Sequence, residues 1–278
     1  MRIARFFALG KDLERLKELD YGADWTDLPL LELAEDDLIN QLRSVLRLGK
    51  GQKFLIIDDN ERIYEMRIEG LEKAKVHCKI ESIVDKEESA SGKCRVEIGL
   101  ALIKSDRFEW CLEKLSELGA AAVSPLLCRH CVVKANKDAK GEEKQERKLQ
   151  RWQAIMREAA EQCERLTIPA IVPPRNLADY LQDRKALSDA LRFICAERRE
   201  AAPLVKALES EISKRDPSPI KQRAPVFLLI GPEGGFSKDE IELAEDQGFL
   251  PVTLGRRILR SETAAIVAMS QVASILDI

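Results

Sequence analysis

Two short apolar segments near the C-terminal end of the sequence are each followed by a polar loop that contains glycine. Residues 226–230 (VFLLI) precede the loop 231–235 (GPEGG), and residues 252–254 (VTL) precede the loop 255–263 (GRRILRSET). Continuous apolar runs this short are typical of strands buried on both faces of a parallel sheet. The pair therefore predicts an α/β domain with a ligand site at the carboxyl ends of neighbouring strands.

The residues around the two loops predict where helices begin. Ser237 stands three residues before Glu240, which is the spacing of a capping box, so a helix is expected from there to about Gln247, with Gly248 ending it. A second helix is expected over residues 264–276. Either loop alone is compatible with an ordinary capped turn, whereas two such loops at adjacent strand ends favour a ligand site. Neither G-x-G-x-x-G nor G-x-x-x-x-G-K-[ST] occurs, which argues against an ordinary Rossmann dinucleotide site and a P-loop.

The rest of the chain predicts two domains. Residues 1–72 are expected to be β-rich, with a strand near 3–8 and a hairpin formed by 52–58 and 62–68. Residues 73–278 form the second predicted domain, to which we assign the β-like run at 75–84. Strands are expected there at 96–103, 121–127 and 191–196, alternating with helices at 106–118, 148–165 and 177–181. This alternation predicts βαβ units and a parallel sheet.

The segment 148–165 has the apolar spacing of an amphipathic helix. Its opposite side carries Glu158, Gln162 and Arg165, which would lie within about 60° of one another on a regular helix. These side chains form either an exposed polar face or one that faces a cleft. The preceding charged residues, 135–148, are interpreted as a frayed loop.

Composition limits the compartment and the cofactors. No apolar run approaches eighteen residues and the N-terminus lacks a signal-peptide pattern, so a soluble cytoplasmic protein with no membrane association is expected. Seven scattered cysteines favour a reducing compartment over a disulfide framework. Cys128 and Cys131 have CxxC spacing with His130 between them, but a second CxxC is absent and we expect no metal site.

Charge does not mark the whole chain as a nucleic-acid-binding protein. The chain has 45 basic and 48 acidic side chains, a net charge of -3, so any RNA site must be a local basic patch. The N-terminal region offers such a patch, with candidate RNA-binding residues Arg2, Arg5, Arg43 and Arg47.

Several motifs resemble one known family. They are IGPEGGFS at 230–237, LGRRILRSETAA at 254–265, EAAEQCER at 158–165, SELG at 116–119, VLRL at 45–48 and RIARFF at 2–7. Together they resemble the ribosomal RNA small subunit methyltransferase E family, which are 16S rRNA uridine-N3 methyltransferases of the SPOUT superfamily. The motifs extend from the first residues to the last predicted helix, so the resemblance covers essentially the whole chain.

The resemblance implies a fold, an activity and a cofactor. The fold would be a SPOUT α/β trefoil-knot domain preceded by a small PUA-like β-barrel domain that binds RNA. The activity would be methylation of a uridine N3 in 16S rRNA of the small ribosomal subunit, with S-adenosyl-L-methionine as methyl donor and a homodimer as the assembly. The implied cofactor-binding residues are Glu197, Ile230, Gly231, Pro232, Glu233, Gly234, Gly235, Leu254, Gly255, Ile258, Leu259, Arg260 and Thr263.

The chemistry of the implied reaction suggests catalytic candidates. Uridine N3 retains its proton at neutral pH, so a base or a nearby positive charge must favour the anion. Arg260, Arg165 and Arg5 are candidates for stabilising that charge, and Glu262 is a candidate general base that could instead cap a helix or bind an arginine. Arg5, Glu158, Gln162 and Arg165 are also candidates for RNA contact. A non-catalytic RNA-binding protein on a SPOUT scaffold, and a metabolic enzyme that binds phosphate in the glycine loop, are the alternatives.

Overall fold

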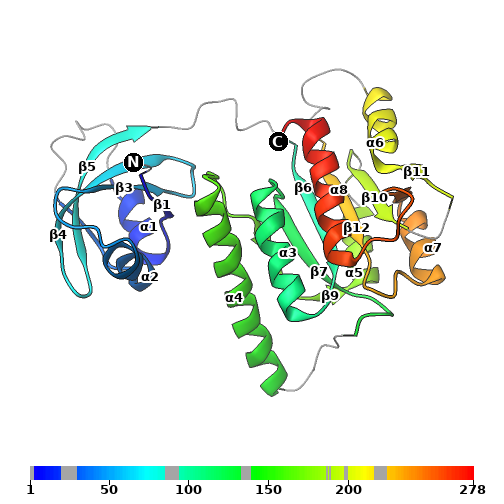
Figure 1. The fold of residues 1–278 in the computed structure, drawn as a ribbon, viewed down its shortest axis with the longest axis horizontal. Helices are drawn as coiled ribbons and strands as arrows, with labels where there is room; N and C mark the ends of the chain where they lie inside the picture. Colours follow the sequence, from blue (N-terminus) through cyan, green and yellow to red (C-terminus); the bar gives the residue numbers. More distant parts are fainter. Residues whose placement is uncertain are drawn as a thin grey trace. The chain divides into compact units, whose positions relative to one another are not determined.

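The protein forms two compact units. The computed structural model describes residues 3–19, 30–84, 94–132, 139–185, 187, 189–196, 200–215 and 224–278. The first unit comprises Met1–Ala90 and Glu161–Thr167, and the second Ser91–Ala160 and Ile168–Ile278. Figure 1 shows a curled sheet in the first unit and a sheet covered by helices in the second.

The first unit is built on a five-stranded sheet with the order β1-β3-β4-β5-β2. Its strands are β1 (Arg5–Phe7), β2 (Leu31–Leu33), β3 (Lys53–Ile57), β4 (Ile63–Leu71) and β5 (Val76–Val84). The predicted hairpin is confirmed, because β3 and β4 pair antiparallel around the turn at 58–62. Buried Asp58 stabilises that turn by accepting hydrogen bonds from the Tyr64 hydroxyl (2.8 Å) and from the backbone N–H of Asn60 and of Arg62 (both 2.9 Å).

The structure corrects the domain boundary expected between residues 72 and 73. Strand β5 pairs with both β4 and β2, so it belongs to the first sheet and not to the second domain. Residues 161–167 also belong to the first unit, although they follow a helix of the second. The sequence pattern of β5 shows that it is a strand but not which sheet it joins.

Helix α1 (Gly10–Lys17), helix α2 (Asp36–Asn40) and the π-helical turn η2 (Gln41–Val45) complete the first unit. Leu16 and Leu42 from these elements are fully buried with Phe54 and Tyr64 of the sheet, in a core of their own. Asp12 of α1 is also buried, and its carboxylate accepts the backbone N–H groups of Ala34 (2.8 Å) and Glu35 (3.0 Å). These bonds fix α1 against the chain between β2 and α2.

The second unit contains a sheet with the strand order β11-β13-β10-β12-β6-β7-β8, and β9 also pairs with β7. The strands are β6 (Val96–Ala101), β7 (Ala122–Leu127), β8 (Ala170–Ile171), β9 (Arg175–Asn176), β10 (Leu191–Cys195), β11 (Ala202–Pro203), β12 (Val226–Ile230) and β13 (Leu250–Thr253). Every pairing described in this sheet is parallel. The carboxyl ends of the strands therefore meet along one edge, as the sequence predicts.

Helices cover both faces of this sheet. They are α3 (Ser105–Glu117), α4 (Ala139–Gln162), α5 (Leu177–Lys185), α6 (Leu204–Ser213), α7 (Lys238–Asp246) and α8 (Ser261–Leu276). Alternate residues of β12 enter two different cores: Val226, Leu228 and Ile230 pack with residues of α3, α4, α6 and α8, whereas Phe227 and Leu229 pack with residues of α5 and α7. This burial on both faces explains why the β12 sequence is apolar without alternation.

Helices α4 and α8 begin several residues before their predicted starts, and α5 extends beyond its predicted end to Lys185. Helix α4 begins at Ala139, so part of the segment interpreted as a frayed loop is helical, while residues 133–138 lie outside the described residues. The Lys, Glu, Gln and Arg residues there are strong helix formers, and Arg147 pairs with Glu143 one turn away. Helix α8 begins at Ser261, which places Glu262 and Thr263 in its first turn. No described helix has the length and apolar character needed to cross a membrane.

Strand β13 lies between β10 and β11, although it follows both in sequence. After β13 the chain returns past the end of β10 to α8, which contacts α3, α6, β6 and β12. This return places residues 254–260 beside the loop that follows β12.

Candidate functional site

The ends of three adjacent strands enclose a cavity of about 460 Å³ at the carboxyl edge of the second unit's sheet. Cys195 and Ala196 line it from the end of β10, residues 230–237 line it after β12, and Ile258, Leu259 and Ser261 line it from the segment after β13. Its volume falls within the range of small-molecule sites, about 300–1,000 Å³. The two loops singled out by the sequence therefore border one cavity.

The loop after β12, residues 231–237, leads directly into α7. The predicted capping box is confirmed: Ser237 Oγ accepts the Glu240 N–H (3.3 Å) and Glu240 Oε2 accepts the Ser237 N–H (2.8 Å). Gly235 has a φ of +72° with open space where a side chain would begin, so its backbone conformation, and not a steric contact, favours glycine. This loop presents the start of α7 and its own backbone to the cavity.

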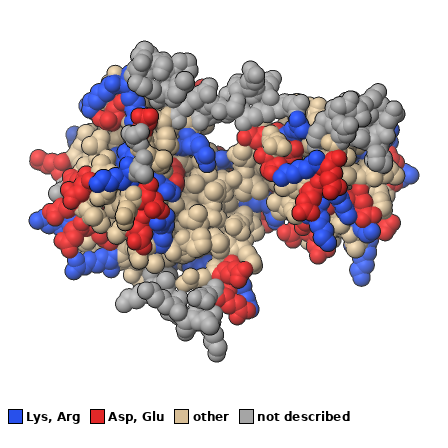
Figure 2. Space-filling model, turned by 180° about the vertical axis from the view of Figure 1, so that it is seen from behind, with Lys and Arg blue, Asp and Glu red and all other residues tan. Residues whose placement is uncertain are grey.

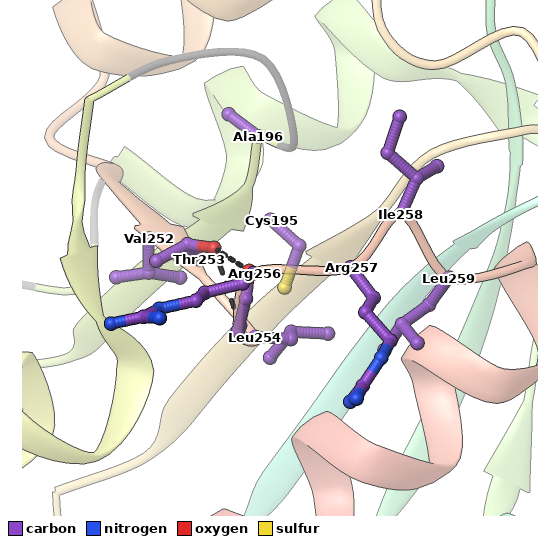
Figure 3. Close-up of a pocket in the computed structure, with 10 residues that line it drawn as sticks. Cys195, Ala196, Val252, Thr253, Leu254, Arg256, Arg257, Ile258 and Leu259 are labelled. Carbon is purple, nitrogen blue, oxygen red and sulfur yellow. Dashed lines mark hydrogen bonds between the residues drawn. The ribbon is translucent and has the colours of Figure 1, made fainter.

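The loop after β13 comprises residues 254–260, and its residues 254–259 line a second hollow of about 30 Å³ next to the first (Figure 3). Thr253 Oγ1 donates to the Gly255 carbonyl (2.9 Å) and accepts from the Gly255 N–H (3.3 Å), which fixes the start of the loop. Arg256 and Arg257 are exposed and leave the loop in different directions. Ile258 is 67% exposed although it borders both hollows, which leaves an apolar surface available to a ligand.

A turn after β7, residues 128–131, forms a further wall of the cavity that the two C-terminal motifs do not predict. His130 Nδ1 lies 3.0 Å from the Gly235 carbonyl oxygen, and the Arg129 N–H donates to Glu240 Oε1 (2.7 Å). Arg129 and His130 both line the cavity. These contacts join residues that are far apart in the sequence, so the sequence does not show them. The sequence shows only that the turn follows a predicted strand of the parallel sheet, as the two loops do.

Glu262 faces an arginine. Pairing with an arginine is one of the two structural roles that the sequence leaves open for this residue. Arg107, near the start of α3, has Nε 3.7 Å from Glu262 Oε1 and Nη1 3.9 Å from Glu233 Oε1. The Glu262 side chain is 12% exposed, and its buried Oε2 has no hydrogen-bond partner among the described residues. A buried carboxylate oxygen normally has a donor, which this atom lacks among the described residues, and Glu262 itself lines neither hollow.

Most of the predicted cofactor-binding residues border the two hollows. Ile230, Gly231, Pro232, Glu233, Gly234 and Gly235 line the larger one, Leu254 and Gly255 line the smaller, and Ile258 and Leu259 line both. Arg260 and Thr263 line neither, because Arg260 is the N-cap of α8 and Thr263 is an exposed residue of its first turn. Glu197 lies outside the described residues. Cys195, Ala196, Phe236 and Ser261 also line the larger cavity, although they are not among the predicted cofactor-binding residues.

The candidate RNA-binding residues of the first unit lie in two places. Arg43 and Arg47 are exposed on either side of Val45 and Leu46, which are 66% and 42% exposed. Arg5 instead pairs with Glu164 (3.1 Å), and the neighbouring Phe7 N–H donates to Glu161 Oε1 (3.0 Å). Arg2 lies outside the described residues. Figure 2 shows acidic and basic side chains interspersed on the face in view, in agreement with the nearly balanced charge.

The shared helical face expected for Glu158, Gln162 and Arg165 is wrong for Arg165. Helix α4 ends at Gln162, and Glu164 has a φ of +63°, which turns the chain out of the helix. Arg165 therefore belongs to the short segment 161–167 of the first unit, where burial lowers the pKa of its guanidinium. Glu158 and Gln162 are exposed on the helix.

The CxxC pair stabilises its own turn. The Cys131 N–H donates to the Cys128 carbonyl (3.1 Å) and the Cys128 N–H donates to Cys131 Sγ (3.3 Å). The hydrogen bond from the Cys128 thiol lowers the pKa of Cys131. Within the described ranges, no group of three His, Cys, Asp or Glu side chains is arranged to hold a metal ion.

Comparisons with known proteins match both units. The RNA methyltransferase domain family matches residues 90–273, and the RNA methyltransferase PUA domain family matches residues 35–81. The chain is 32% identical to the ribosomal RNA small subunit methyltransferase E of Synechocystis sp., over 86% of this chain and 71% of that protein. It is 26% identical to the Bacillus subtilis protein of the same name, over 84% and 86%.

Solved structures resemble the whole chain. A methyltransferase from Legionella pneumophila in complex with the cofactor SAM matches with a TM-score of 0.76 and 28% identity, covering 99% of this chain and 98% of that one. The ribosomal RNA small subunit methyltransferase E of Neisseria gonorrhoeae, bound to S-adenosyl methionine, matches with a TM-score of 0.74 and 25% identity over the same shares.

Proposed function

The chain belongs to the ribosomal RNA small subunit methyltransferase E family, and we propose that it transfers a methyl group from S-adenosylmethionine to N3 of a uridine in 16S rRNA. Its fold class is that of the family, a SPOUT α/β-knot domain preceded by a PUA-like β-rich domain. The observation that carries the proposal is the single cavity bordered by both C-terminal loops.

The residues around the cavity fit the proposed cofactor. Its volume of about 460 Å³ suits a small molecule, and the exposed Ile258 offers an apolar contact beside backbone groups of both loops. The bound donor supplies an electrophilic methyl group on its sulfonium. The protein's task is then to orient donor and base and to exclude water, for which backbone from rigid strand ends is suited.

Glu262 is the strongest candidate for receiving the uridine proton. Its Oε2 is buried without a described partner, and Nε of the adjacent Arg107 lies 3.7 Å from Oε1. Ser261 and Ala264, on either side of it in the chain, border the cavity. Arg260, the N-cap residue of α8, remains the proposed source of positive charge for the uridine oxygens. Arg5 pairs with Glu164 within the first unit.

The first unit is proposed to bind the RNA. Arg43 and Arg47 place positive charge beside the exposed Val45 and Leu46, a combination that suits a nucleic acid backbone and an unstacked base. The base must be unpaired, because N3 lies on the Watson–Crick edge. We further propose that the enzyme acts in the cytoplasm as a homodimer, with part of the apolar α8 region in the interface.

Methylation of isolated small ribosomal subunits tests this proposal. Subunits from cells that lack the protein are incubated with it and labelled S-adenosylmethionine, and their nucleosides are analysed by mass spectrometry. We expect 3-methyluridine in 16S rRNA, and no methyl transfer by a Glu262→Ala variant that still binds the donor. Donor binding without methyl transfer by the unaltered protein would favour the non-catalytic alternative, and the absence of donor binding would contradict the proposal entirely.

A further inference from the structure

The turn at residues 128–131 lies at the cavity. It contains none of the residues that the family resemblance implies for cofactor binding, RNA binding or catalysis. In the sheet, β6 separates β7 from β12, so the turn after β7 spans the end of β6 to contact the loop after β12. The hydrogen bonds between Cys128 and Cys131 stabilise its shape. A stabilised turn of this kind is able to hold a neighbouring loop in one conformation.

His130 contacts the two consecutive glycines of that loop. A carbonyl oxygen only accepts hydrogen bonds, so the 3.0 Å contact with Gly235 requires a proton on Nδ1. A Cβ added at Gly234 would lie 2.9 Å from the Cβ of His130, closer than real Cβ contacts. His130 thus contacts the loop at a point where only glycine fits, and where the next residue has a φ of +72°.

The neighbouring Arg129 joins the same turn to α7. Its N–H donates to Glu240 Oε1 (2.7 Å), while Glu240 Oε2 accepts the Ser237 N–H of the capping box (2.8 Å). The Arg129 guanidinium also lies 3.0 Å from Asp239, but these side chains are 66% and 80% exposed and contribute little. The backbone of the turn, more than the arginine charge, therefore fixes the start of α7.

We propose that His130 is a positioning residue for the methyl donor: it holds residues 234 and 235 in the conformation that opens the cavity. The inference rests on the proposed function, because the donor is the ligand concerned. The His130 imidazole contacts the Gly235 carbonyl, whereas the His130 Cβ lies against Gly234. Different substitutions can therefore remove the hydrogen bond and the Cβ contact separately.

The first test replaces the ring. We expect His130→Ala to weaken S-adenosylmethionine binding in calorimetry by roughly three- to tenfold, the range for one neutral hydrogen bond. His130→Asn should restore binding to within about twofold, because the asparagine amide nitrogen stands the same number of bonds from Cα as Nδ1. Val132→Ala, on the same stretch of chain but 71% exposed and away from the cavity lining, should bind like the unaltered protein.

Kinetics distinguish positioning from general loss of structure. The His130→Ala variant should raise the KM for the methyl donor while leaving the KM for the ribosomal subunit and the melting temperature close to those of the unaltered protein. Unchanged donor affinity in His130→Ala, or no rescue by a folded His130→Asn, would overturn the inference. Failure of the unaltered protein to bind the donor would instead contradict the proposed function.

A double-mutant cycle tests the contact with Gly234. We expect Gly234→Ala to weaken donor binding about tenfold or more in the unaltered background, because its Cβ would meet that of His130 at 2.9 Å. In a His130→Gly background, the same substitution should cost less than about threefold. Equal costs in the two backgrounds would show that the turn does not set the shape of the loop.

Discussion

The two loops at the cavity differ in what fixes their shape. The loop after β12 is contacted from other elements: His130 lies against Gly234 and Gly235, Arg107 faces Glu233, and Glu240 joins the turn to α7. In the loop after β13, Thr253 and Gly255 hydrogen-bond each other, and the side chains of residues 256–258 are exposed. We conclude that polar contacts from other elements fix the first loop, whereas the second is fixed by the Thr253–Gly255 hydrogen bonds and by the packing of Leu254 and Leu259 against the core.

The largest expected effect comes from the backbone of the second loop. Gly255 has a φ of +134°, which a residue with a side chain rarely adopts, so Gly255→Ala should cost about 1–3 kcal/mol in its present conformation. Relaxation of the loop would then weaken S-adenosylmethionine binding about tenfold in calorimetry.

Gly248→Ala is the matched control for that substitution. Gly248 has a φ of +83° and also has open space around it, but it follows α7 and does not border the cavity. It should lower the melting temperature and leave donor affinity unchanged. Equal losses of affinity in the two variants would mean that the shape of residues 254–260 is not specific to the site.

A smaller effect on donor binding is expected from the substitution of Glu240, whose side chain contacts both the first loop and the turn after β7. Glu240→Ala removes the capping box and the bond to the Arg129 N–H, so it should destabilise the protein by about 0.5–2 kcal/mol and weaken donor binding several-fold. Thermal melting and calorimetry measure the two effects. Glu242→Ala, on the same helix with only an exposed pairing to Lys238 at 3.6 Å, should change stability by less than about 0.5 kcal/mol.

The arginines of the second loop should affect RNA more than the donor. Arg256→Ala and Arg257→Ala each remove an exposed charge, so each should weaken subunit binding a few-fold and reduce the salt dependence by about one unit of slope. Binding titrations at several salt concentrations measure this. A large loss of donor affinity in either variant would indicate that these side chains, and not only the backbone, bind the donor.

The smallest expected effect is a change in the thiol reactivity of Cys131, in the turn at residues 128–131 that contacts the first loop. The Cys128 thiol lowers the pKa of Cys131, whereas burial raises the pKa of Cys78 and of Cys111 to about 12. A lower pKa means that more thiolate is present at a given pH, so iodoacetamide should modify Cys131 before either buried thiol near neutral pH. Cys128→Ala should shift the pH profile of this modification upward. An unchanged profile, followed by mass spectrometry, would contradict the described thiol contact.

The contrast between the loops also explains what could be predicted from the sequence. Strand 226–230, the capping box and the glycine loop depend on neighbouring residues, and each was located correctly. The contacts of His130 with residue 235 and of Arg107 with Glu262 join residues more than 100 positions apart, which a single sequence does not show. Likewise, β5 could be recognised as a strand, but its sequence does not show which sheet it joins. The turn at Glu164, which excludes Arg165 from α4, could not be predicted because it lacks the glycine that usually marks the end of a helix.

Hydrogen–deuterium exchange with and without S-adenosylmethionine tests the central claim most directly, namely that both loops bind one donor. We expect the donor to slow amide exchange together in residues 231–237 and 254–260, with no change in the β3–β4 hairpin of the first unit. Protection of one loop without the other, or of neither, would contradict a shared cofactor pocket.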